Sequence, residues 1–126
     1  MKKALSLLLI LGIFCGIATA DDHLGKFRHV VLFKFKEEAT PEQIQNIEEE
    51  FRKLPSKIDT IIDFEWGKTQ TVEVDLAQGY THCFLVTFKD KAGLETYIPH
   101  PDHQAFVKVL RPLLEEVHVF DYVASK

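Results

Sequence analysis

The sequence of 126 residues is poor in cysteine, with two, and has only one tryptophan, one methionine and 15 basic against 19 acidic side chains. The net charge of −4 argues against nucleic-acid binding, which needs a basic face. Two cysteines cannot build a disulfide framework. The length allows one core, and the 46% hydrophobic content excludes a disordered chain. The ten phenylalanines that are present indicate a large core or an apolar cavity.

Long hydrophobic runs are confined to the first 20 residues, which have the pattern of a secretory signal peptide. A basic start at Lys2 and Lys3 precedes an apolar run over residues 5–17, and residues 18–20 have the small residues of a signal-peptidase cleavage site. The run is shorter than the roughly 20 residues of a membrane-spanning helix. We therefore predict cleavage after Ala20, and a secreted or periplasmic protein without membrane association.

Two alternatives remain for this segment. One is an uncleaved N-terminal anchor, and the other is lipid attachment at Cys15. A lipid-modified cysteine normally follows a small residue, whereas Phe14 stands in that place here. Cleavage would leave Cys83 as the last thiol, so that no internal disulfide could form. Because Cys83 lies in an apolar run, we predict that it is buried as a small hydrophobic residue.

The remaining chain shows alternating and helical hydrophobic patterns in turn. Strands are predicted at residues 29–36, 61–67, 80–88 and 117–122. The main helices are predicted from a cap at Thr40 to Pro55-Ser56, and from about residue 102 to 114 with an irregular last turn at Pro112. Asp90 begins a short helix, and residues 68–79 form a loop. The order β-α-β-β-α-β predicts an α+β, ferredoxin-like fold with an antiparallel four-stranded sheet.

The predicted strands are apolar on both faces. In residues 80–88, Phe84 and Val86 alternate with Cys83 and Leu85, and residues 29–36 behave likewise. The helices cover one face of such a sheet, which leaves an apolar patch on the other. We therefore predict a homodimer formed through the sheet.

Four motifs in one continuous order now carry a family resemblance. They are His29-Val30-Val31-Leu32-Phe33-Lys34-Phe35-Lys36, Gly79-Tyr80-Thr81-His82, Tyr97-Ile98-Pro99-His100-Pro101-Asp102-His103 and Val119-Phe120-Asp121-Tyr122. Over residues 27–122 the chain resembles the stress-responsive dimeric alpha/beta-barrel (Dabb) family. The resemblance implies a ferredoxin-like protomer whose sheet packs against a second copy to form a barrel.

The same motifs resemble those of polyketide cyclases in that family, which implies roles for individual residues. His103 and Tyr97 match the catalytic pair, and His29 and His82 match further cavity histidines. A neutral imidazole can take a proton next to a carbonyl while a phenol binds the oxyanion. The chain departs from the cyclase pattern at Pro99, where an aliphatic residue is expected. The further candidate ligand contacts are Tyr80, Phe84 and Trp66.

Three functional hypotheses remain open. The first is a binding protein for a small apolar or aromatic molecule, the second is a cyclase-like enzyme, and the third is a structural protein without a ligand. Residues 100–103 could simply shape a turn, with Pro101 fixing φ and Asp102 capping a helix. The histidines lack the spacing of zinc motifs, and no axial haem ligand can be assigned, so we predict neither metal nor cofactor.

His103 is the residue on which a site would depend most. It is predicted in the first turn of a helix, near the positive end of the helix dipole. That field lowers the pKa of an imidazole and keeps it neutral near pH 7. The sequence therefore predicts His103 as a proton or hydrogen-bond acceptor beside Tyr97.

Overall fold

The computed structural model describes residues 22–126, and the predicted signal segment lies outside them. The strands are β1 (Phe27–Phe35), β2 (Ile61–Lys68), β3 (His82–Phe88) and β4 (Leu114–Val123). The helices are α1 (Pro41–Lys57), α2 (Val74–Ala77), α3 (Lys91–Tyr97) and α4 (Pro101–Leu110), and the 3-10 turn η1 (Arg111–Leu113) follows α4. In this part of the chain, no helix has the length and apolar character needed to cross a membrane.

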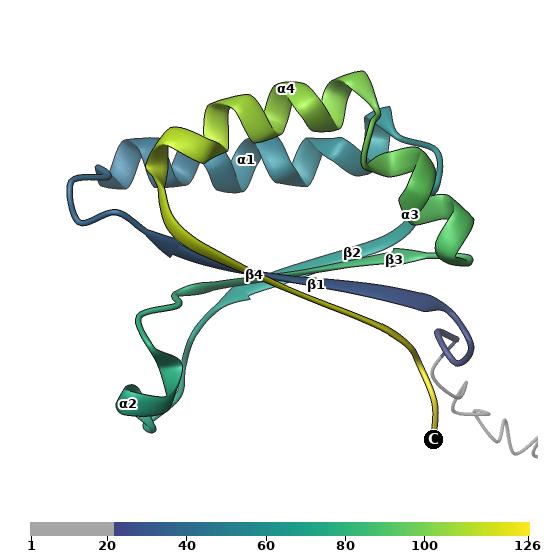
Figure 1. The fold of residues 1–126 in the computed structure, drawn as a ribbon, viewed down its shortest axis with the longest axis horizontal. Coiled ribbons are helices and arrows are strands. Elements are labelled where there is room, and N and C mark those ends of the chain that lie inside the picture. The colour runs from purple at the N-terminus through teal and green to yellow at the C-terminus, as the bar shows by residue number, and fades with distance from the viewer. Residues whose placement is uncertain (1–21) are drawn as a thin grey trace, which may run out of the picture.

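The strands form one antiparallel sheet in the order β2-β3-β1-β4, so that β2 and β4 are its edges. Helices α1 and α4 lie side by side on one face, and α2 lies on the opposite side of the sheet (Figure 1). This arrangement confirms the predicted ferredoxin-like α+β fold. It gives the sheet a covered face below α1 and α4 and an open face on the side of α2.

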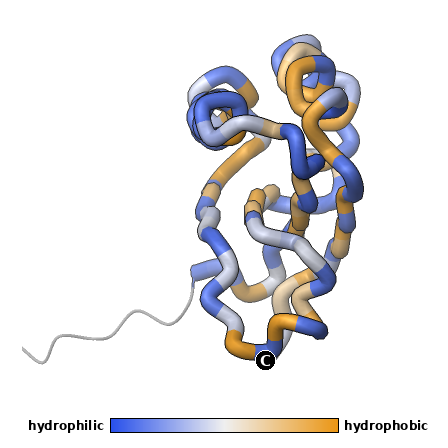
Figure 2. Tube along the Cα trace, turned by 90° about the vertical axis from the view of Figure 1, so that its left-hand side faces the viewer, coloured by the Kyte–Doolittle hydropathy of each residue, from blue (hydrophilic) through white to orange (hydrophobic). Residues whose placement is uncertain are grey.

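The core lies between the helices and the covered face. The Phe51 ring of α1 stacks on Phe84 of β3 at 4.4 Å between centroids and meets Phe106 of α4 at 4.6 Å. All three are at most 5% exposed. Hydrophobic residues accordingly recur along the strands below the two helices (Figure 2). Burying each such side chain contributes about 1.5–3 kcal/mol to folding.

The ends of α1 follow from local hydrogen bonds. The Gln43 amide donates to Thr40 Oγ1 at 3.2 Å and the Thr40 amide donates to Gln43 Oε1 at 2.9 Å, which confirms the predicted cap. The predicted end at Pro55-Ser56 is one residue early, because α1 continues to Lys57. Pro55 removes one donor, but the Ile58 amide still donates to the Leu54 carbonyl at 2.9 Å and closes the last turn.

Other boundaries differ by a few residues. Helix α4 ends at Leu110, Pro112 lies in η1 as the predicted irregular turn, and β4 already begins at Leu114. Strand β3 begins at His82, two residues later than predicted, and the predicted loop 68–79 contains the short helix α2. These shifts leave the topology unchanged.

The open face is partly apolar, as predicted from the two-sided strands. Phe120 of β4 is 60% exposed there, and Val30, Leu32 and Leu85 are partly exposed. Cys83 is exposed, so the prediction that it is buried is wrong for the protomer. The reason is alternation along β3: because Phe84 points under the helices, its neighbour Cys83 points away from them.

Candidate active site

The covered face contains a cavity between α4 and the edge strand β4, called here the α4–β4 cavity. Its volume is about 470 Å³. It exists because α4 does not cover β4 completely, and Val117 and Val119 are therefore 51% and 49% exposed. The apolar lining includes Val31, Phe33, Phe106, Val107, Leu110, Val117 and Val119. The polar and charged lining residues are His29, Tyr97, His103, Arg111, Glu115, Glu116 and Asp121.

Tyr97 and His103 meet in this cavity. Tyr97 is the last residue of α3, and His103 lies in the first turn of α4. The His100 side chain caps α4 by accepting a hydrogen bond from the Asp102 amide at 3.1 Å. The tight connection between the helices places the rings of Tyr97 and His103 4.1 Å apart, centroid to centroid.

His103 is arranged as a neutral acceptor. Its Nδ1 lies 2.8 Å from the Ile98 carbonyl oxygen, which can only accept, so Nδ1 carries the proton and Nε2 is left unprotonated. Burial lowers the pKa of His103, the hydrogen bond to Ile98 opposes that shift, and the charges of His29 and His100 lower it further. The predicted direction is therefore confirmed, but its main cause is burial.

Tyr97 supplies a hydroxyl donor to the cavity. Its side chain is 1% exposed, and burial raises the pKa of its hydroxyl well above the usual value, so the phenol stays protonated. Within residues 22–126 the hydroxyl has no hydrogen-bond partner, which leaves it available to a bound molecule.

His29 enters the cavity from β1, and its partner there is Asp121, which the sequence pattern does not indicate as a site residue. The two residues are opposite one another in the β1–β4 pairing, and Nδ1 of His29 lies 2.6 Å from Oδ1 of Asp121. The available signal was a carboxylate between the aromatic residues Phe120 and Tyr122 of β4. Pattern alone could not pair it with a histidine 92 residues away.

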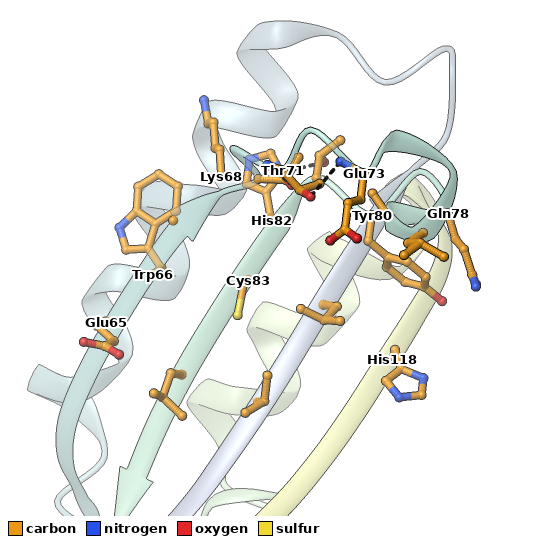
Figure 3. A pocket seen from close by; sticks show the side chains of 18 residues that line it. Glu65, Trp66, Lys68, Thr71, Glu73, Gln78, Tyr80, His82, Cys83 and His118 are labelled. Carbon is orange, nitrogen blue, oxygen red and sulfur yellow. Dashed lines mark hydrogen bonds between the residues drawn. The ribbon is translucent and has the colours of Figure 1, made fainter.

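A second pocket of about 880 Å³ lies on the open side of the sheet, beside α2 (Figure 3). Three of the predicted ligand contacts, Trp66, Tyr80 and His82, line the rim of this open-face pocket, although the side chains of Trp66 and His82 contact Phe84 and Glu48 on the covered face. The Tyr80 hydroxyl donates to Glu116 Oε2 at 3.1 Å. The structure therefore divides the predicted site residues between two pockets, and His29, Tyr97 and His103 line the α4–β4 cavity.

His82 is occupied by protein partners. Its Nε2 lies 2.9 Å from Glu48 Oε1, and its Nδ1 lies 2.8 Å from Thr81 Oγ1. Lys68 Nζ approaches the same Glu48 oxygen at 3.0 Å. Burial opposes ionisation of Glu48, but the hydrogen bonds from His82 and Lys68 outweigh it and lower the pKa of this carboxyl. His82 therefore connects α1 to the sheet.

The remaining candidates, Phe84, Trp66 and Cys83, offer no reactive group to a ligand in the protomer. Phe84 is fully buried and lines neither the α4–β4 cavity nor the open-face pocket. Trp66 stacks on it with 5.5 Å between centroids. Partial burial and the Glu65 carboxylate raise the pKa of the Cys83 thiol, which disfavours the nucleophilic thiolate. Residues 22–126 contain no cluster of three or more side chains suited to a metal ion.

Sequence comparison identifies the family of this chain and several related proteins. Residues 27–124 match the family model of the stress-responsive A/B barrel domain. The stress-response A/B barrel domain-containing protein HS1 of Arabidopsis thaliana is 38% identical over 102 residues, which are 81% of this chain and 93% of that protein. The olivetolic acid cyclase of Cannabis sativa is 34% identical over 99 residues, which are 79% of this chain and 97% of the cyclase.

Solved structures agree with the fold. An Arabidopsis thaliana protein superposes with a TM-score of 0.75 at 36% identity and covers 79% of this chain and 96% of its own. A protein from Jannaschia, described as dimeric and ferredoxin-like, has a TM-score of 0.69 at 25% identity, over 79% of this chain and 100% of its own. The hydroxynitrile lyase of Passiflora edulis shares the fold, with a TM-score of 0.74 at 24% identity, over 80% of this chain and 94% of the lyase.

Proposed function

This chain belongs to the stress-responsive A/B barrel domain family, and from that premise we propose that it binds a small, largely apolar molecule in the α4–β4 cavity. One observation carries the proposal. The cavity is mainly apolar, yet it contains a free phenol on Tyr97 and a free imidazole nitrogen on His103. An apolar pocket with a few converging polar groups is the usual form of a small-molecule site.

Filling the cavity tests this proposal. Val119 lines it and is 49% exposed, whereas Val109 on α4 is 47% exposed and does not line it. Calorimetry with phenol, acetophenone and naphthalene should show binding to the parent and to Val109→Trp, and its loss in Val119→Trp. Equal binding by both variants, or no binding by the parent, would contradict the proposal.

We further propose that two copies pair through the open face. The support is the apolar open face together with the relatives described as dimeric. Light scattering should give twice the protomer mass for the parent and for Val109→Lys. Phe120→Lys should give the protomer mass, because it places a charge on the apolar open face. A monomeric parent at micromolar concentration would contradict pairing.

A second candidate function is acid–base catalysis on a carbonyl compound. The specific observation is the 4.1 Å between the ring centroids of Tyr97 and His103, in a chain that is 34% identical over 99 residues to olivetolic acid cyclase. Incubation with a linear poly-β-ketone and mass spectrometry tests it. A cyclised product that disappears with Tyr97→Phe supports catalysis, and an unchanged product profile contradicts it.

Export is proposed on the sequence pattern of residues 1–20. Mass spectrometry of secreted or periplasmic material should find a chain that begins at Asp21. A retained Met1 or a lipid on Cys15 would contradict cleavage after Ala20.

A further inference from the structure

His118 of β4 lies on the open face of the sheet. It is opposite Leu32 of β1 in the β1–β4 pairing, and Leu32 is opposite Cys83 of β3. All three side chains line the open-face pocket, where the His118 imidazole lies beside the Tyr80 ring (Figure 3). An ionisable side chain therefore stands in the row of residues that crosses the proposed pairing surface.

The apolar surface continues around His118. Phe120, two positions further along β4, is 60% exposed, and Leu76 of α2 is 72% exposed and lines the same pocket as His118. Helix α2 has no buried residue, so its aliphatic side chains do not serve the core of the protomer. Pairing of two copies would remove this surface from water, and the His118 imidazole with it.

Nothing in the protomer is arranged to balance a positive charge on His118. Within residues 22–126 its imidazole forms no hydrogen bond or ion pair, and its ring contact is with Tyr80, 6.4 Å away between centroids. In contrast, His23, His29 and His82 each have a carboxylate oxygen at 2.7, 2.6 and 2.9 Å. His118 differs from these histidines because it lacks such a carboxylate.

The ionisable groups that face His118 come from several elements. Glu116 precedes it by two positions on β4 and accepts from the Tyr80 hydroxyl at 3.1 Å. Lys34 is opposite Glu116 on β1, and its Nζ lies 3.9 Å from Glu115. The neighbouring carboxylate on β4 is therefore already engaged, and a cation lies opposite it. The other ionisable residues that line the pocket are Glu65, Lys68, Glu73, His82 and Cys83.

We propose that His118 makes the pairing of two copies depend on pH, so that the copies pair while the imidazole is neutral and separate when it is protonated. The inference rests on the pairing through the open face proposed above. Burial of a charged imidazole without a partner is costly, whereas a neutral imidazole costs much less. An imidazole changes its charge between about pH 8 and pH 5. Pairing should therefore be strongest at the alkaline end of this range and weaken as the pH falls.

The dependence should be steep. Each copy contributes one His118, so separation of the pair takes up two protons. Where protonation limits pairing, one proton changes the dissociation constant about tenfold per pH unit, and two protons change it by up to about 100-fold.

Analytical ultracentrifugation at pH 7.5 and pH 5.5 measures the dissociation constant of the pair, and circular dichroism at both pH values shows whether the protomer stays folded. We expect the dissociation constant of the parent to rise by about 30-fold or more between pH 7.5 and pH 5.5. His118→Leu should pair equally well at both pH values. His118→Lys should pair weakly at both, because it places a permanent charge at the same position.

His100 provides the matched control. Its side chain caps α4 on the covered side of the sheet, and it lines neither pocket. His100→Asn keeps a side-chain acceptor at the cap and removes an imidazole from the chain. The dissociation constant of this variant should therefore rise on acidification as that of the parent does.

The outcomes distinguish the inference from the proposed pairing. A parent that is monomeric at pH 7.5 contradicts the pairing, and the inference with it. A parent that pairs equally at both pH values, or more tightly at pH 5.5, leaves the pairing intact and overturns the inference. A His118→Leu protein that separates on acidification like the parent also overturns it, because another group would then carry the pH dependence. Since His118→Leu is expected to keep pairing, unfolding of this variant cannot imitate the expected result.

Discussion

The two pockets on opposite sides of the sheet differ in size and in the state of their polar groups. The open-face pocket has about 880 Å³ and the α4–β4 cavity about 470 Å³. In the larger one, His82 and Tyr80 are already hydrogen-bonded to Glu48 and Glu116. In the smaller one, Tyr97 and His103 keep groups available to a ligand. The α4–β4 cavity is therefore the better candidate site, because its polar groups are unpartnered in an apolar setting, although its volume is smaller.

The largest expected effect distinguishes the core from both pockets. Phe84→Ala should lower the free energy of unfolding by about 3–5 kcal/mol, because it leaves a hole among stacked rings. Urea denaturation measures this loss. Val109→Ala, on the exposed side of α4, should change stability by less than about 0.5 kcal/mol. A mild effect of Phe84→Ala would mean that the ring is not part of the tightly packed core.

The network of His82 should matter for stability. Glu48→Gln should cost about 1–3 kcal/mol at pH 7, because it removes a carboxylate that accepts from His82 and Lys68. Glu50→Gln on the same helix removes an exposed pair with Lys53 and should cost about 0–0.5 kcal/mol. Equal losses of unfolding free energy in the two variants would show that burial of the Glu48 pair adds nothing to stability.

The pH dependence has a definite sign. The folded-state pKa of Glu48 is lowered from 4.5, so its carboxylate adds stability above pH 4.5. That contribution disappears as the pH falls through the lowered folded-state pKa. The difference in stability between the parent and Glu48→Gln should therefore shrink in urea titrations below pH 4.5, and a difference that grows on acidification would contradict the assignment.

A histidine in each pocket allows a direct comparison. His103→Gln should keep the melting temperature and weaken acetophenone binding by about tenfold, which is about 1.4 kcal/mol. His118→Gln, in the open-face pocket, should leave binding unchanged. Calorimetry on both variants is the measurement. If His118→Gln has the larger effect, the site lies on the open side of the sheet.

The smallest effect concerns Cys83. Its thiol is exposed in the protomer and lies on the surface proposed to pair. Iodoacetamide should alkylate it several-fold more slowly in the parent than in Phe120→Lys, because pairing would cover it. Equal rates would show that Cys83 lies outside the interface.

Much of the fold was predictable because its patterns are local. Alternation defined β3, and Thr40 with Gln43 defined the start of α1. Pro55 was misleading, since one missing donor did not end a helix whose Phe51 and Leu54 pack in the core. The short α2 has no buried residue to give it a periodic signal.

The site was predictable only in part. Tyr97 and His103 are six positions apart, so the short turn between their helices brings them together. The His29–Asp121 pair depends on the register of two strands far apart in sequence, which no local pattern states. Cys83 was predicted to be buried because its neighbours are apolar, but those neighbours do not show which face of the sheet the helices cover.

Strand β4 has one further consequence. It is an edge strand, and its residues alternate between two surfaces: Val119 and Asp121 line the cavity, while Phe120 and Tyr122 point to the open side. A slip of one residue against β1 would place an aromatic ring opposite His29 and a carboxylate on the apolar open face. An insertion or deletion within β4 would therefore damage both surfaces together, whereas point substitutions can alter either surface alone.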